Sequence, residues 1–312
     1  WPIVGTTDAQ GGPGLLRKED NTLKTFTAAG GQTIFRGNKL GENMIGQYFI
    51  PEPVGRLVRR SIITEENGYR KLINPLKSLK KEFIASTDPN FRPVNTFTGP
   101  DGCLYIIDMY RGIIQESNWV RPGSYLYEEI LRKKLHKNVQ RGRIYRISKD
   151  GIKPDNIPKF DSFSNDQLIN ALAHPNGWWR DEAQKRLVLG QNKSVINKLK
   201  KMVLSEKSSL GRVHAIWTLK GLNSFDKKTA EISLNDSSWK VQHAAVRASE
   251  NIILTDLAFL NSLKNIKPRN EKVAKQLILS LGMCNSLDEV NSDKKEVASL
   301  IIQKIAMDYP KN

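Results

Sequence analysis

Hydrophobic and polar residues alternate with a period of two in several short segments of the first half of the chain. The clearest segment is 94–98, after which Pro100, Asp101 and Gly102 lead into the apolar residues 103–107. Proline presets one backbone angle, aspartate bonds its own backbone, and glycine adopts a positive φ at little cost. The pattern therefore predicts a β-hairpin, with the residue before its first strand and the residues after its second strand at the same end.

Similar segments occur before and after this hairpin. Residues 33–36, 47–50 and 56–62 predict three earlier strands, and residues 142–147 predict a later strand of the hairpin's own unit. The stretch inserted before that later strand has apolar residues at helical spacing around Tyr127 and Leu131, which predicts a short helix. We interpret the two antiparallel units as β-propeller blades. A propeller closes with about four to eight blades, so we expect the chain to hold only part of one.

Helical periodicity replaces this pattern from about residue 163. Alanines recur within similar helical motifs at intervals of 32, 30, 29 and 24 residues, at Ala183, Ala215, Ala245, Ala274 and Ala298. Repeats of this length predict stacked helix pairs, as in an α-solenoid of HEAT-like repeats. We expect the shorter last interval to mark a terminal capping repeat.

The predicted fold class is therefore β followed by α in a multidomain chain. We place the C-terminal blades of a β-propeller in residues 1–150 and an α-solenoid of HEAT-like repeats in residues 151–312. A length of 312 residues and a hydrophobic content of 39% agree with two folded domains. The two cysteines, Cys103 and Cys284, are too few and too far apart in sequence for a disulfide framework or a metal motif.

The chain carries 49 basic and 32 acidic residues, a formal net charge of +17, which would suit an anionic partner. Its lysines, however, are spread through the predicted helices without interleaved aromatic residues, and no known nucleic-acid-binding module is recognisable. We therefore favour solvated helix faces over nucleic-acid binding. No signal peptide or transmembrane run occurs in the sequence, and this absence assigns no compartment.

The hairpin geometry brings Arg92, Asp108 and Arg111 to one end, and we expect them near Glu52. Rim arginines exposed to solvent would bind carboxylates, because the planar guanidinium matches them. Asp108 and Glu52 are candidates for a catalytic base or for oxygen ligands of a divalent cation. The residues leave an alternative open, in which Asp108 caps a turn and Arg92 bridges blades through backbone carbonyls.

Several motifs together resemble large bacterial proteins known as membrane-bound or sorbosone/glucose-type dehydrogenases, in which a β-propeller precedes HEAT repeats. The motifs of the first half are WP at 1–2, QGG at 10–12, FTAA at 26–29, FRG at 35–37, EPVGR at 52–56, FRPV at 91–94, DMYRGII at 108–114 and GRIYRI at 142–147. The segment HPNGWWR at 174–180 is similar to the family's entry into its helical repeats.

This resemblance implies a periplasmic or extracellular protein that uses pyrroloquinoline quinone, with a divalent cation, to oxidise a sugar or polyol. Arg36 and Arg56 match basic residues that contact the quinone in similar blades. Many such proteins end in a c-type cytochrome domain, but this chain has no Cys-x-x-Cys-His motif and cannot attach a haem covalently. The earlier blades, which would supply the family's catalytic histidine, are also missing from it.

Two main hypotheses follow. The favoured one is a fragment of an extracytoplasmic quinoprotein-like sugar or alcohol dehydrogenase with a HEAT-repeat interaction domain, which we expect to be inactive by itself. The alternative is a non-catalytic propeller and solenoid that binds carbohydrate or a protein partner, because propellers serve many functions.

Overall fold

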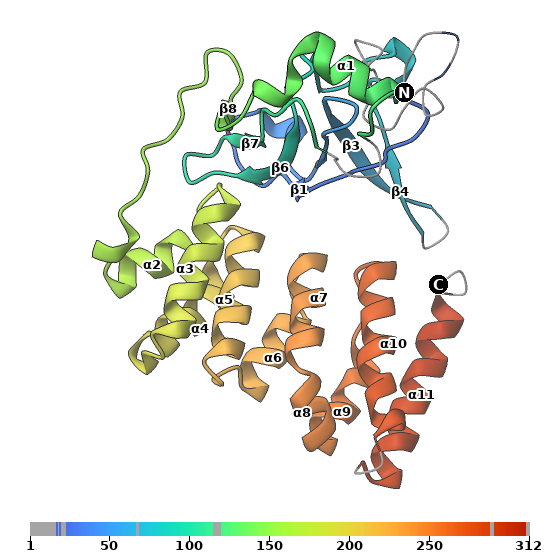
Figure 1. The fold of residues 1–312 in the computed structure, drawn as a ribbon. Helices are drawn as coiled ribbons and strands as arrows, with labels where there is room; N and C mark the ends of the chain where they lie inside the picture. The colour runs from blue at the N-terminus through green and yellow to red at the C-terminus, as the bar shows by residue number, and fades with distance from the viewer. Residues whose placement is uncertain are drawn as a thin grey trace. The chain divides into compact units, whose positions relative to one another are not determined.

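The computed structural model describes residues 17, 19, 23–66, 69–114, 120–287 and 290–309. The chain divides into two compact units, Trp1–Ile157 and Pro158–Asn312. In the described residues, antiparallel sheets occur in the first unit and the second unit is helical (Figure 1). The sequence predicted a β-sheet part followed by a helical part, and the structure confirms this order.

The first sheet has five strands, and all of its pairings are antiparallel. The order is β1-β2-β3-β4, and β5 pairs with the start of β3. Strand β3 is long enough to pair with β2 through its first half and with β4 through its second half, where Glu66 lies opposite Tyr69. The strands are β1 (Thr33–Ile34), β2 (Tyr48–Glu52), β3 (Leu57–Glu66), β4 (Tyr69–Ile73) and β5 (Ile84–Ala85).

The second sheet contains the predicted hairpin. Strands β6 (Pro93–Thr98) and β7 (Leu104–Asp108) are antiparallel, with Pro93 opposite Asp108, and β8 (Arg143–Ile147) pairs with the other edge of β7. Gly102 in the turn has a φ of 81°, as the turn residues predict. Helix α1 (Tyr125–Lys133) lies in the insertion between β7 and β8, so that prediction is also confirmed.

The two sheets share one core. Phe35, Phe49 and Val58 of the first sheet's segments pack with Leu104 and Ile106 of the second. The sheets also approach through backbone at Gly37, where an added Cβ would lie 2.3 Å from the carbonyl oxygen of Gly102. No other residue type fits this contact without a shift of backbone, so the segment that follows β1 is held close against the turn of the β6–β7 hairpin.

The helices of the second unit form two rows. Helices α3, α5, α7 and α10 pack in succession as one row, and α2, α4 and α6, then α8 with α9, and finally α11 pack against them. The helices are α2 (Asn165–Ala171), α3 (Gly177–Leu189), α4 (Ile196–Ser205), α5 (Ser209–Gly221), α6 (Lys227–Leu234), α7 (Trp239–Ala248), α8 (Glu250–Thr255), α9 (Leu257–Ser262), α10 (Glu271–Ser286) and α11 (Ser292–Asp308).

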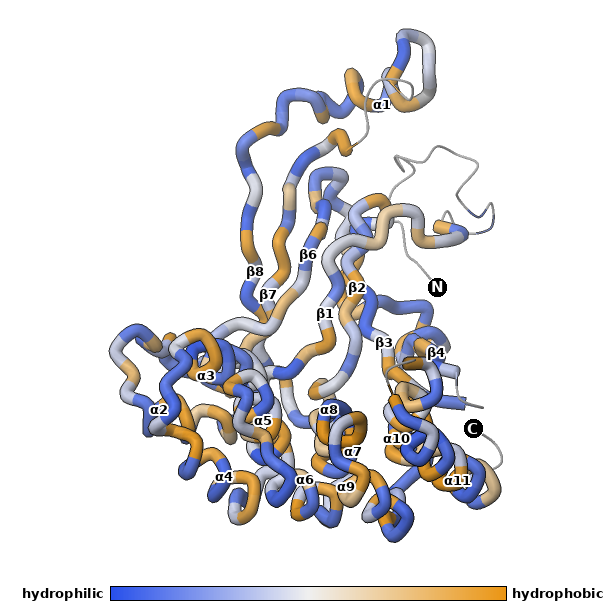
Figure 2. The backbone as a smooth tube through the Cα atoms, turned by 90° about the horizontal axis from the view of Figure 1, so that it is seen from below, coloured by the Kyte–Doolittle hydropathy of each residue, from blue (hydrophilic) through white to orange (hydrophobic). Residues whose placement is uncertain are grey.

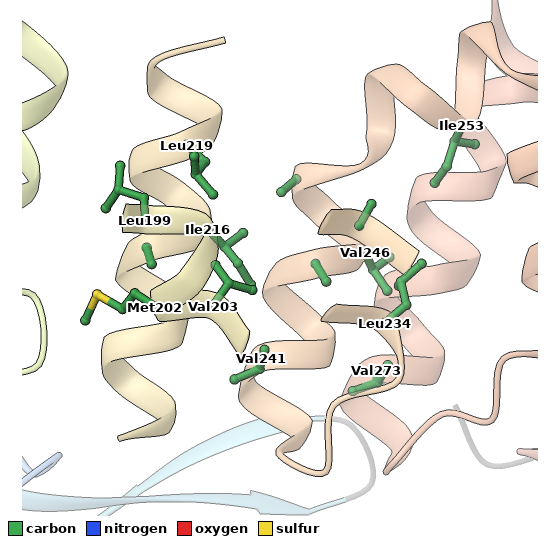
Figure 3. Close-up of a cluster of buried hydrophobic side chains, with 14 of the residues drawn as sticks. Leu199, Met202, Val203, Ile216, Leu219, Leu234, Val241, Val246, Ile253 and Val273 are labelled. Carbon is green, nitrogen blue, oxygen red and sulfur yellow. The ribbon is translucent and has the colours of Figure 1, made fainter. Parts of the chain in front are cut away.

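Apolar and polar segments alternate along these helices, as Figure 2 shows. The apolar side chains point into the space between the rows, where Leu199 of α4 and Ile216 of α5 are fully buried, as are Val241 of α7 and Val273 of α10 (Figure 3). Burial of one apolar face on neighbouring helices is what stabilises helices of this length, since isolated helices shorter than about 12 residues are marginal in water.

The recurring alanines are all fully buried, but only four are equivalent. Ala183, Ala215, Ala245 and Ala274 occupy the successive helices α3, α5, α7 and α10, where a small side chain lets neighbouring helices approach closely. Ala298 lies in α11, which is the packing partner of α10 rather than the next member of that row. The interval of 24 residues therefore spans half a repeat, and its interpretation as a capping repeat is wrong.

Polar side chains at a second recurring position donate hydrogen bonds to the loops between helix pairs. Arg180 donates from Nη1 to the carbonyls six and five residues before it, at 2.5 and 2.8 Å. Arg212 donates to the carbonyls at the same two offsets, at 2.6 and 3.3 Å, and forms an ion pair with Asp236 of the next loop at 2.8 Å. Gln242 donates to Leu234 O and Lys267 O, at 2.8 and 3.0 Å. The residue three positions before each of the first three alanines thus fixes the loops.

The buried alanines generate a prediction about stability. Replacing Ala215 by leucine adds three carbon atoms to a fully packed space, so we expect the free energy of unfolding to fall by about 1–3 kcal/mol. The matched control is Ala306→Leu on an exposed face of α11, which should change it by less than about 0.5 kcal/mol. Urea unfolding of both variants checks this, and equal effects at the two positions would contradict the packing argument.

Candidate functional site

The hairpin brings Arg92 and Asp108 together, as predicted. The Arg92 backbone N–H donates to Asp108 Oδ1 at 2.7 Å, and the Tyr110 N–H donates to the same oxygen at 2.8 Å. The backbone of Met109 donates to Arg92 O at 2.9 Å. Asp108 therefore closes a turn at the end of β7, which confirms the capping interpretation for one of its two oxygens.

The guanidinium of Arg92 bridges the two sheets. It donates to Pro53 O at 2.8 Å and Val54 O at 3.5 Å after β2, and to Arg111 O and Gly112 O, both at 3.2 Å, after β7. The side chain is only 1% exposed. The expectation of a solvated rim arginine is therefore wrong for Arg92, and the alternative, in which it acts through backbone carbonyls, is confirmed. Its donors satisfy carbonyls at the ends of strands that would otherwise be buried and unpaired.

Glu52 is also fully buried, at the end of β2. Its Oε1 accepts hydrogen bonds from the backbone of Ala28 at 2.9 Å and of Thr27 at 3.2 Å, and from the Thr27 hydroxyl at 3.3 Å. Its Oε2 accepts from the backbone of Gly55. These bonds connect the segment before β1 to the turn after β2, so both carboxylate oxygens already have structural partners.

Asp108 differs from Glu52 in its second oxygen. Within the described part of the chain, Asp108 Oδ2 is buried and has no hydrogen-bond partner. Burial raises the pKa of Asp108, the hydrogen bonds from the Arg92 and Tyr110 backbones and the charge of Arg143 lower it, and Asp88 raises it again. The net direction is upward, because the buried anion loses more hydration than its partners replace.

A polar cluster beside Asp108 was not predicted from the sequence. The Arg143 guanidinium carbon lies 3.4 Å from the ring centroid of Tyr110, and Asn138 Nδ2 donates to Tyr110 O at 2.8 Å and to Asn90 Oδ1 at 3.0 Å. Asp88 Oδ1 accepts from the Asn90 backbone at 2.9 Å. Arg143 opens β8 and pairs in register with Asp108, which is the signal that could have revealed it.

The remaining candidate arginines do not form one group. Arg56 is fully buried in the turn after Glu52, with a φ of 56°, and the Arg111 side chain is exposed after β7. The Arg36 backbone donates to the Thr98 hydroxyl at 3.1 Å, which places Arg36 at the turn end of the hairpin. Arg92 lies at the opposite end of β6, so the structure does not bring Arg36 to the other candidates.

Among the described residues, no three or more histidine, cysteine or acidic side chains gather in a way that could hold a metal ion. None of the described helices is long and apolar enough to cross a membrane. Cys103 and Cys284 are buried, and burial, the largest effect on each, raises the pKa of Cys103 to about 11 and also raises that of Cys284.

The bridging role of Arg92 generates the second prediction. Arg92→Met keeps much of the apolar stem but leaves several buried carbonyls without donors, so the free energy of unfolding should fall by about 3 kcal/mol or more. Arg141→Met, at an exposed position before β8, is the control and should change it by less than about 0.5 kcal/mol. Chemical denaturation gives both values. Equal stability of the two variants would show that the carbonyls find other donors.

The buried oxygen of Asp108 generates the third prediction, which concerns pH. Because the pKa is raised above 3.8 in the folded state, the stability that protonated Asp108 contributes is present below pH 3.8 and is lost as pH rises through the folded pKa. Asp108→Asn keeps the acceptor for Arg92 and Tyr110 but cannot ionise. The wild type should therefore lose stability relative to this variant as pH rises above about 3.8 and through the folded pKa of Asp108.

Urea unfolding across this pH range measures the difference between the two proteins. A wild-type advantage that grows with pH would contradict the prediction, because it would mean that a positive charge compensates the anion.

Comparison with known proteins assigns a family model to the first unit alone. Residues 1–151 match the model of a domain of unknown function, DUF7133. No curated protein matches the chain. The motifs at 1–2 and 10–12 that support the resemblance to propeller dehydrogenases lie outside the described residues. The part of the chain that contains Glu52, Arg92 and Asp108 is thus similar to a domain whose function is not defined.

Proposed function

We propose that the chain is part of an extracytoplasmic propeller–solenoid protein with a non-catalytic, partner-binding role. In this proposal the first unit contributes blades to a β-propeller and the second unit is a HEAT-like solenoid that binds a protein partner. The observation that carries the proposal is the use of charged groups at the hairpin end. Arg92 and Glu52 are buried, and their polar atoms bond the backbone of two sheets.

The architecture supports both parts of this proposal. Two antiparallel sheets that share a core and approach through a parallel bridge between Gly31 and Asn95 are compatible with adjacent blades. Four equivalent helices in a row, each with a buried alanine and a second row packed against them, are compatible with a solenoid. The extracytoplasmic location is supported by the sequence resemblance alone.

A quinoprotein-like sugar or alcohol dehydrogenase is the second candidate. It is favoured by the resemblance and by the buried Asp108 Oδ2, which has no hydrogen-bond partner among the described residues. A quinone with three carboxylates needs several cationic donors that converge on one pocket. Arg92 donates instead to backbone carbonyls, and Arg36 lies at the other end of the hairpin. These residues therefore do not fit the cofactor, which is why this candidate ranks second.

The fourth prediction tests the second candidate. Pyrroloquinoline quinone with Ca²⁺ should leave the melting temperature of the protein unchanged, because Arg92 and Glu52 already have internal partners. A ligand at about 100 times its Kd stabilises the folded state by about 2.7 kcal/mol, which shifts a melting temperature by several degrees. The measurement is a thermal melt over a quinone titration. A saturable rise that is lost in Asp108→Asn would support the dehydrogenase instead.

A further inference from the structure

One face of helix α7 carries a row of side chains that the packing of the helical unit does not use. Trp239, His243 and Arg247 are spaced four residues apart, so they lie one above the other along the helix. Lys272 comes from α10, the neighbouring helix of the same row. The ammonium nitrogens of Lys240 and Lys272 lie 5.9 and 5.5 Å from the centroid of the Trp239 ring. We refer to these five residues as the α7 stripe.

Apart from the half-buried His243, the stripe faces away from the core of the helical unit. Val241, Ala245 and Ala248 lie on the buried side of α7, whereas Arg247 is exposed and Trp239 is 37% exposed. A large aromatic ring that remains this accessible between two lysines offers an apolar surface surrounded by positive charge. The sequence predicted no aromatic residue among the lysines, because Lys272 is 33 positions from Trp239 and only packing brings them together.

The electrostatics of the stripe, like its geometry, favour a negatively charged ligand. Burial, Arg247 and Lys272, in that order, lower the pKa of His243. Both charged groups that act on the imidazole are therefore cations, one from its own helix and one from α10. Like charges held close together reduce the stability of the folded state, and a bound anion would offset that repulsion.

We propose that the α7 stripe binds an acidic peptide segment of a partner protein, with an apolar or aromatic side chain of the peptide against Trp239. This proposal rests on the partner-binding function above and specifies its surface. Tryptophan and arginine are the residue types most enriched where binding energy concentrates at protein interfaces. From Trp239 to Arg247 the helix rises about 12 Å, which matches about four residues of an extended peptide.

A nucleic acid shares the negative charge but fits the stripe less well. Proteins that bind single strands offer several aromatic rings on which successive bases stack. The stripe provides one exposed ring, Trp239, beside the half-buried imidazole of His243, and two lysine nitrogens lie over the indole ring. Carboxylates on both sides of one apolar side chain therefore match the arrangement better than a run of phosphates and bases.

The experiment measures binding of a fluorescently labelled peptide of alternating glutamate and phenylalanine to the whole protein by anisotropy. The stripe variant is Lys240→Gln with Arg247→Gln, and the control is Lys201→Gln with Lys228→Gln, which removes two exposed charges from α4 and α6. The stripe variant should weaken binding about tenfold or more, and the control less than about twofold, because specific contacts exceed the effect of net charge. Circular dichroism establishes that both variants are folded.

Three results would overturn the proposal: no binding to the wild type, equal weakening by the two variants, or tighter binding of a single-stranded oligonucleotide than of the peptide. Trp239→Phe should retain most of the affinity and Trp239→Ala should lose it, since the aromatic face is what the peptide contacts. The quinone titration does not involve the stripe. Failure of the peptide to bind would therefore reject this surface, whereas a quinone-dependent rise in melting temperature would reject the non-catalytic function.

Discussion

In the described part of the first unit, the connection between the ends of the two sheets depends on one buried guanidinium. Arg92 donates to carbonyls that follow β2 in the first sheet and to carbonyls that follow β7 in the second. Strand ends leave carbonyls without partners in their own sheet, and water cannot reach them once the sheets share a core. Arginine meets this need because its five N–H groups point outward in a plane and stay charged at any physiological pH.

The same constraint explains the carboxylates nearby. Glu52 accepts hydrogen bonds from backbone groups of Thr27, Ala28 and Gly55, and Asp108 accepts from those of Arg92 and Tyr110. Charges that converge at one end of a hairpin resemble a catalytic site in the sequence, but irregular backbone at strand ends demands the same residue types. A catalytic role differs from a structural one in whether the polar atoms already have hydrogen-bond partners. By that criterion, among the described residues, Asp108 Oδ2 differs from both Glu52 oxygens.

Local signals were predictable from the sequence, and long-range ones were not. The turn residues Pro100 to Gly102 determine the hairpin by their own backbone preferences, and the recurrence of buried alanine identifies the main row of helices. The sequence could offer a bridging Arg92 only as an alternative, because its burial depends on carbonyls near Pro53 in another sheet. The place of Ala298 was also hidden, because its motif lies in α11, which packs against α10 instead of continuing the row, and only the packing distinguishes the two cases.

In the helical unit, some positions along the helices hold neighbouring helices and loops together, and other positions face outward. Three residues before each of the first three alanines, Arg180, Arg212 and Gln242 all bond loop carbonyls, so that position is fixed by the repeat itself. One position later come Asp181, Val213 and His243, three unrelated side chains. A position that the repeat does not constrain is free to carry a function specific to one helix. The cations around Trp239 and His243 occur where the array imposes no requirement of its own, and that makes this surface a better candidate for partner recognition than the charged residues at the hairpin end.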